Sequence, residues 1–216
     1  MVRKDIKEFI TTIPLNVTII AATKYVYAHD MMILLESGID NFGENRVDSF
    51  LEKYEILKDK NIVWHFIGHL QRNKAKEVIN KIDYLHSLDS LKLANIIEKE
   101  RKTPLNTFIE VSINGEGNKN GVRIDEVDNF IKELIGFRKI NIVGLMMMAK
   151  ANSSPASLKE QFAQLRLLRN KLEKTFAIKL PYLSMGMSDD YKYALEENAT
   201  HIRLGRILFS KNKRQP

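Results

Sequence analysis

The sequence of 216 residues contains no cysteine. This absence excludes disulfides, thiolate metal sites, iron–sulfur clusters and a cysteine nucleophile. Nor does any apolar run approach the roughly 20 residues that a membrane-spanning helix needs. The first ten residues, MVRKDIKEFI, are charged throughout and lack the apolar stretch of a secretion signal. We therefore expect a cytoplasmic protein.

Proline is scarce as well: the five prolines are scattered, and no Pro- or Ser-rich linker divides the chain. A composition of 44% hydrophobic and 28% charged residues is typical of an ordinary globular protein. A chain of this length buries a large core without covalent crosslinks. We expect a single domain over residues 1–216.

The excess of positive charge is modest. Lys and Arg number 34 against 27 Asp and Glu, a net charge of +7, and three of the positive residues fall within the last six. A basic chain attracts anions weakly, but dispersed charges more often form a solvated surface. The pattern favours a disordered basic tail at 211–216 over a nucleic-acid-binding face.

Short apolar runs alternate with longer runs at helical spacing. Several of the short runs, such as VTIIAA and IVGLMM, are apolar throughout, which is typical of strands buried on both faces of a parallel sheet. The expected strands are Val17–Ala22, Ile39–Phe42, Ile62–Ile67, Ile82–Leu85, Leu105–Val111, Ile140–Met146, Leu180–Leu183 and His201–Leu204.

The intervening segments are amphipathic. Leu158, Phe162, Leu165, Leu168, Leu172 and Phe176 fall on one helical face. Ser90 is in position to cap the helix that follows the fourth strand. Eight βα repeats predict a (β/α)₈ TIM barrel of the α/β class, with an extra N-terminal helix at 3–12. An open doubly wound sheet is the alternative.

A barrel places its active residues at the carboxyl ends of its strands. Small, polar and ionisable residues gather just past the expected strands: Thr23-Lys24, Gly43–Asn45, Gly68-His69, Ser87, Ser112–Asn114, Met147-Met148, Ser184–Ser188 and Arg203–Gly205. This collection of side chains predicts a ligand site at one end of the barrel.

Lys24 directly follows a buried strand. A lysine that faces a pocket is partly desolvated, which lowers the pKa of its amine and lets the neutral form attack a carbonyl. The alternative is a lysine whose amine simply reaches solvent, and for an isolated lysine this alternative is favoured.

Two loops near the C-terminus have the composition of an anion site. Gly186 and Ser188 precede a helix, and backbone N–H groups with a serine hydroxyl bind anions. Arg203 ends the last strand, and Gly205 allows close backbone approach there. The loops after strands seven and eight bind phosphate in many barrels. The alternatives are an ordinary helix cap at Ser188 and a structural ion pair of Arg203.

Metal binding is disfavoured. His65 and His69 are four residues apart, but the segment reads as strand and loop, so the helical geometry of a two-histidine site is absent. His29, His86 and His201 are interpreted as structural or surface residues. The run Met146–Met148 is interpreted as core and barrel lining.

Seven segments occur in a fixed order: ATK, FGENRV, WHFIGHLQRNK, VSINGEGNKNGV, GLMMM, LSMGMSDDY and IRLGRILF. Together they strongly resemble the pyridoxal phosphate homeostasis protein family, over about residues 19–209. WHFIGHLQRNK and LSMGMSDD are too long for a chance match. The family is similar to the isolated barrel domain of fold-type III enzymes, the alanine racemase class.

The resemblance implies roles for individual residues. Lys24 matches the lysine that forms the internal aldimine with pyridoxal 5′-phosphate (PLP). Ser188 and Gly205 match phosphate contacts, assisted by backbone N–H groups around Gly186. Arg203 matches the arginine that faces the pyridine nitrogen, and because it keeps its proton it leaves that nitrogen unprotonated. The residues expected to line the ring pocket are Asn45, His65 and Met185.

One position departs from the family pattern. Many members carry a small hydroxyl residue after the glycine of the last motif, where this chain has Arg206. The arginine side chain either adds a charged contact to the phosphate or turns outward and leaves only its backbone N–H.

The resemblance implies a non-enzymatic, monomeric PLP carrier that delivers the cofactor to apo-enzymes, with no membrane or nucleic-acid partner. No second domain is expected to cover the site or to supply a second base. The alternative is a fold-type III amino-acid racemase that uses Lys24 as one base. A basic anion-binding module ranks last, because aromatic and basic residues are not interleaved on one face.

Overall fold

The computed structural model describes residues 1–113 and 120–210. The expected basic tail at 211–216 and residues 114–119 of the glycine-containing loop lie outside the described residues. The strands are β1 (Thr18–Ala22), β2 (Asn41–Glu44), β3 (Val63–Phe66), β4 (Tyr84–Leu88), β5 (Leu105–Ser112), β6 (Val122–Arg123), β7 (Ile140–Met146), β8 (Tyr182–Met187) and β9 (His201–Leu204). The helices are α1 (Ile6–Thr11), α2 (Ala28–Glu36), α3 (Val47–Leu57), α4 (Ala75–Val78), α5 (Leu91–Glu100), α6 (Val127–Leu134), α7 (Pro155–Phe176), α8 (Tyr191–Glu196) and the 3₁₀ turn η1 (Arg206–Leu208).

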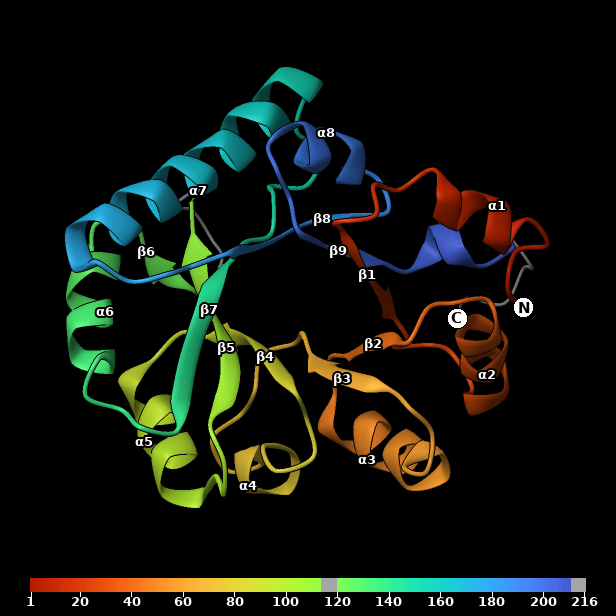
Figure 1. The fold of residues 1–216 in the computed structure, drawn as a ribbon, viewed down its shortest axis with the longest axis horizontal. Helices are drawn as coiled ribbons and strands as arrows, with labels where there is room; N and C mark the ends of the chain where they lie inside the picture. The colour runs from red at the N-terminus through yellow and green to blue at the C-terminus, as the bar shows by residue number, and fades with distance from the viewer. Residues whose placement is uncertain (114–119, 211–216) are drawn as a thin grey trace.

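The strands form a closed parallel barrel. Their hydrogen-bonded order is β4-β3-β2-β1-β9-β8-β7-β5, and the pairing of β4 with β5 closes the ring. The two-residue strand β6 adds to the edge of β5 outside the ring. Helices surround the strands (Figure 1). The predicted TIM barrel with an additional N-terminal helix is confirmed, and the open sheet is excluded by the β4–β5 pairing.

Three strands begin later and extend further than expected. β2, β4 and β8 start two residues after the apolar residues that suggested them, and they continue into polar or small residues such as Glu44, Ser87 and Gly186. Ile39, Ile82 and Leu180 are instead buried just before their strands. An apolar run marks burial rather than pairing, so the sequence pattern shifted these strands toward the amino end.

The helices pack their apolar faces on the barrel. In α7, Leu158, Phe162, Leu165, Leu168 and Leu172 are buried, as the spacing predicts. Ser90 caps α5, and its side chain accepts a hydrogen bond from the Leu93 N–H. The main hydrophobic core therefore fills the layer between strands and helices.

The barrel interior has its own small core. Phe108, Val143 and Met146 form a buried cluster, with Tyr84 and Tyr182 packed against it. Met147 is buried in the main core, while Met148 is 39% exposed. The prediction that Met146–Met148 serve as core and lining therefore holds for the first two of these residues.

The two ends of the described chain meet. Val2 and Phe209 form an antiparallel bridge, and Arg3 N–H donates to the Leu208 carbonyl. Among the described residues, no helix has both the length and the apolarity needed to cross a bilayer.

Gly144 tests the packing of the barrel wall. A Cβ at this position would overlap the carbonyl oxygen of Tyr182, its partner on β8. Gly144→Ala should lower the free energy of unfolding by about 3 kcal/mol, measured by urea denaturation, because the strands would have to separate. Gly136→Ala is the matched control, since nothing lies within 4 Å of its added Cβ. Equal stability of the two variants would contradict the close approach of β7 and β8.

Candidate functional site

Five of the predicted site residues follow four neighbouring strands. Lys24 comes after β1, Asn45 after β2, Ser188 after β8, and Gly205 and Arg206 after β9. The strand order β2-β1-β9-β8 is continuous in the barrel (Figure 1). Because the strands are parallel, these residues lie at the same end, on one side of the barrel mouth.

Lys24 projects from this end with an exposed side chain. Its Nζ lies 4.7 Å from the centre of the Tyr25 ring, which is 70% exposed. The solvent-exposed alternative for Lys24 is therefore the one that the structure shows. The amine is accessible to a ligand that enters the mouth.

Arg203 is buried inside the barrel, where its guanidinium is held by uncharged acceptors. Nη1 donates to the Ser184 carbonyl at 2.8 Å and to Ser184 Oγ at 2.6 Å, and Nη2 donates to the Met147 carbonyl at 2.8 Å. Burial lowers the pKa of Arg203 to about 10. The group is therefore still a cation at neutral pH. No ion pair of Arg203 occurs among the described residues, so the structural ion-pair alternative is not supported.

A chain of hydrogen bonds runs from Arg203 into the barrel. Ser184 Oγ lies 2.9 Å from His86 Nδ1, and His86 Nε2 lies 2.9 Å from His65 Nδ1. His65 Nε2 ends the chain at Asn41 Oδ1, 2.8 Å away. Burial holds the pKa of both histidines well below the usual 6.5, so both rings are neutral at neutral pH.

The direction of every bond in this chain follows from its ends. Asn41 donates its amide N–H to Asp40, so its Oδ1 accepts from His65 Nε2. His65 Nδ1 must then accept from His86, and His86 Nδ1 must accept the Ser184 hydroxyl proton. Ser184 Oγ is left with its lone pairs for Arg203. The neutral histidines thus fix the acceptor that holds the buried guanidinium.

Two expected pocket residues lie elsewhere. His65 is fully buried and stacked on Tyr84, with ring centres 4.7 Å apart. It supports Arg203 through His86 instead of facing the mouth. Met185 is buried in the core between strands and helices, because it alternates with the inward-facing Ser184. These positions correct the expectation that both side chains line the ring pocket.

The loops after β8 and β9 meet at Ser188. Its Oγ accepts hydrogen bonds from the N–H groups of Gly205 at 3.1 Å and Ile207 at 3.4 Å. Gly186, the next-to-last residue of β8, has φ +91, and a Cβ there would lie 2.7 Å from the Ala194 side chain, so only glycine fits this position. The Ser188 hydroxyl and these two backbone N–H groups converge at one point, and they form a donor set suited to phosphate when the N–H groups exchange Ser188 Oγ for the ligand.

Arg206 turns away from these donors. Its guanidinium pairs with Asp189, and both side chains are more than two-thirds exposed. Of the two alternatives for Arg206, the structure shows the outward-turned side chain. Its backbone stays at the loop while its charge lies outside. Asp190 Oδ1 accepts from the Met187 N–H at 2.5 Å. Both aspartates have partners of their own.

Asn45 carries an unsatisfied polar atom. Its Oδ1 is buried without a hydrogen-bond partner in the described part of the chain. Since buried oxygens in folded proteins usually accept a hydrogen bond, this atom is a free acceptor for a ligand. A ligand with a hydroxyl or N–H group at the mouth would supply one.

Glu110 is a functional candidate that the sequence analysis missed. It is 5% exposed and lies two residues before the carboxyl end of β5. Burial, reinforced by Asp89 and opposed by Arg203, raises its pKa to about 7. The signal available in the sequence was a carboxylate within the expected buried strand Leu105–Val111. His86, interpreted from the sequence as a structural or surface residue, is a buried structural residue, and it shares one face of β4 with Tyr84.

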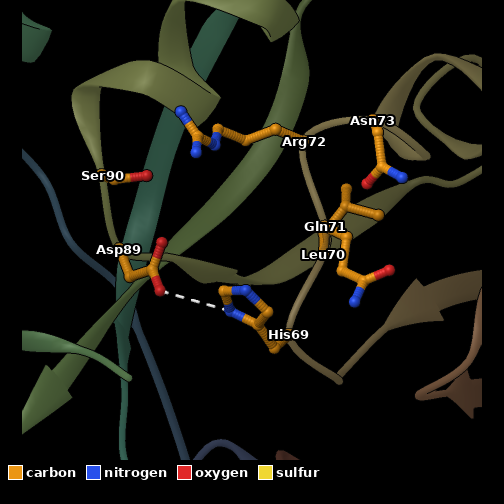
Figure 2. A pocket seen from close by; sticks show the side chains of 7 residues that line it. All are labelled: His69, Leu70, Gln71, Arg72, Asn73, Asp89 and Ser90. Atoms are coloured by element: carbon orange, nitrogen blue, oxygen red, sulfur yellow. Dashed lines mark ion pairs between the residues drawn. The ribbon is translucent and has the colours of Figure 1, made fainter. Parts of the chain in front are cut away.

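A separate polar pocket of about 520 Å³ lies between the loops after β3 and β4. His69 Nδ1 lies 3.5 Å from Asp89 Oδ2 across it, and the Arg72 side chain extends toward Ser90 (Figure 2). None of the nine predicted binding residues lines this pocket. Among the described residues, no group of three or more metal-ligating side chains occurs.

Comparison with known proteins shows to which family this barrel belongs. The family model for the alanine racemase N-terminal domain matches residues 2–213. The pyridoxal phosphate homeostasis protein of Aquifex aeolicus is 37% identical over 198 residues, which are 90% of this chain and 87% of that protein. The chain belongs to the pyridoxal phosphate homeostasis protein family. The family assignment made from the motifs is confirmed.

Solved structures agree with this family. PipY of Synechococcus elongatus, with PLP bound, is 30% identical, with a TM-score of 0.86 over 95% of this chain and 100% of PipY. Alanine racemase of Clostridium difficile shares the fold at 14% identity, with a TM-score of 0.80. This homeostasis-family chain covers 59% of that racemase. The relatives are named as homeostasis proteins rather than as enzymes.

Glu110 should leave a pH signature in this family member. The folded-state pKa of Glu110 is raised from 4.5 to about 7, so its favourable contribution is complete below pH 4.5 and lost as pH rises through 7. Glu110→Gln abolishes that loss. Relative to wild type, its free energy of unfolding should increase by about 3 kcal/mol across this window, measured by urea denaturation.

The surface variant Glu77→Gln is the control for this titration. Its difference from wild type should stay flat over the same pH range, because Glu77 is exposed. A flat difference for Glu110→Gln as well would show that this carboxyl ionises normally.

Proposed function

We propose that this chain is a PLP-binding protein that holds the cofactor on Lys24 and passes it to apo-enzymes without catalysing a reaction itself. The observation that carries the proposal is the pairing of β1 with β9. It places the accessible Lys24 amine beside the strand that presents the buried Arg203 cation. The bound PLP in PipY supports the choice of ligand.

The residues present fit PLP. Ser188 Oγ and the N–H groups of Gly205 and Ile207 would hold the phosphate. Asn45 Oδ1, which lacks a hydrogen-bond donor, would accept a hydrogen bond from a hydroxyl of the ligand ring. Arg203 would donate to the pyridine nitrogen. Because the pKa of Arg203 stays near 10, it would keep its proton and leave that nitrogen unprotonated.

When bound, PLP supplies an aldehyde whose carbon forms a C=N bond with the Lys24 amine, while its oxygen leaves as water. The protein residues contribute binding and orientation. Neutral His65 and His86 keep Ser184 directed toward Arg203. The positive φ of Gly186 near the end of β8 precedes Ser188, whose hydroxyl contacts the backbone after β9. An unprotonated ring is a weak electron sink, which suits storage of the cofactor better than chemistry on amino acids.

The racemase alternative gains one observation. Glu110, with a pKa of about 7, is a carboxyl able to take up or release a proton near neutral pH. The relatives' names favour the carrier. We therefore retain a non-catalytic role. Transient contact with apo-enzymes, a monomeric state and a cytoplasmic location remain predictions.

The Lys24 attachment is tested by visible absorption. Wild type mixed with PLP should gain a band that borohydride abolishes, and Lys24→Ala should show no such band. Lys192→Ala, another exposed lysine, is the control and should keep it. A reducible band that persists in Lys24→Ala would place the attachment elsewhere, and a wild type without any band would refute PLP attachment.

The carrier and the racemase are separated by hydrogen exchange. PLP-loaded protein incubated with L-alanine in deuterated water should incorporate no deuterium at Cα, as measured by proton NMR. Sustained exchange in wild type that disappears in Glu110→Gln would replace the carrier with an enzyme that uses Glu110 as its acid–base group.

A further inference from the structure

A buried polar cluster lies behind Lys24, between the barrel wall and α3. It consists of Thr23, Glu44 and Lys53, whose exposed fractions are 0%, 0% and 6%. Lys53 Nζ donates to Glu44 Oε1 at 2.5 Å and to the Thr23 carbonyl at 2.6 Å. The Thr23 hydroxyl donates to the same Glu44 oxygen at 2.5 Å. None of the predicted binding residues belongs to this cluster.

The cluster fixes every polar group of Thr23. The Thr23 N–H donates to the Gly43 carbonyl at 3.0 Å, and its hydroxyl donates to Glu44. Its carbonyl accepts from Val26 N–H at 2.9 Å and from Lys53. That carbonyl belongs to the peptide unit that continues into Lys24. The backbone of Lys24 is therefore held from behind, while its side chain remains exposed.

Stability alone does not account for such a cluster. A buried ion pair loses so much hydration that an apolar pair of similar size is often equally stabilising. What an apolar pair cannot provide is a second donor, beside the Val26 N–H, for the Thr23 carbonyl. The lysine of the pair reaches from α3 to that one carbonyl, which precedes Lys24 directly. The carboxylate of Glu44 holds the Lys53 amine in position, and the pair adds no net charge beside the Lys24 amine.

We propose that Lys53 and Glu44 are positioning residues that orient the backbone of Lys24, so that its amine meets the PLP aldehyde. This inference rests on the proposed function. Neither residue touches the ligand; both act through Thr23. Their effect should therefore fall on the formation of the C=N bond and not on the binding of the phosphate and ring.

The test uses two ligands and the variant Lys53→Met/Glu44→Leu, which removes both charges together and preserves burial. With PLP, the rate at which the visible band appears should fall by about 10- to 100-fold, because a misplaced reacting group loses its alignment. With 4′-deoxypyridoxine 5′-phosphate, which lacks the aldehyde, the Kd from calorimetry should match wild type. Lys58→Met, which removes an exposed pair with Glu55 at the end of the same helix, should change neither value.

The outcomes separate the alternatives. An unchanged rate of band formation would overturn the proposal, and parallel losses with both ligands would show a merely structural cluster. A wild type that binds the analogue but never forms the band would refute the attachment to Lys24, and with it this inference. If circular dichroism shows that the double variant is unfolded, Thr23→Val takes its place. It removes only the hydroxyl's bonds to Glu44 and to the Gly43 carbonyl, and it should slow band formation without altering the Kd of the analogue.

Discussion

The burial of one guanidinium inside the barrel is the constraint on which the rest of the site depends. A cation removed from water needs acceptors, and Arg203 finds two carbonyls and the Ser184 hydroxyl rather than a carboxylate. The Ser184 oxygen is free to accept a hydrogen bond from Arg203 because the hydroxyl donates its own hydrogen bond to His86 Nδ1. This donation requires that the histidines are neutral. Their burial keeps them neutral. The interior thus holds a positive charge that is oriented but not neutralised by contact.

The buried Arg203 cation, whose hydrogen-bond acceptors are all uncharged, influences the electrostatics of the barrel mouth. The Arg203 cation favours an anionic or electron-rich ligand at the mouth. On the pKa of a nearby carboxyl group it acts against burial, because burial raises that pKa and the cation lowers it. At Glu110 burial outweighs the attraction of Arg203, which leaves its pKa near 7. At Asp190 burial again raises the pKa, although the Met187 N–H lowers it in part. The charges around the site therefore follow from the depth at which each group lies.

The barrel wall divides the polar groups into two sets. Side chains alternate along a strand, so Thr23 faces the helical layer while Lys24 follows at the mouth. The outer set, with Lys53 and Glu44, is closed and satisfied. The inner set keeps one unpaired atom, Asn45 Oδ1. The outer polar groups have all their hydrogen bonds and form a rigid support, while the inner groups keep a free acceptor for a ligand.

The sequence by itself determined the barrel, the helix faces and the segments that form the mouth, because strand burial, helical spacing and motif order are local patterns. It also placed Lys24, Ser188 and Gly205 after their strands. Only the tertiary structure decided that His65 supports Arg203 through His86 and that Arg206 pairs with Asp189. His86 and Ser184 are 98 residues apart, and such contacts depend on which strands become neighbours. Spacing along the chain carries no information about that pairing.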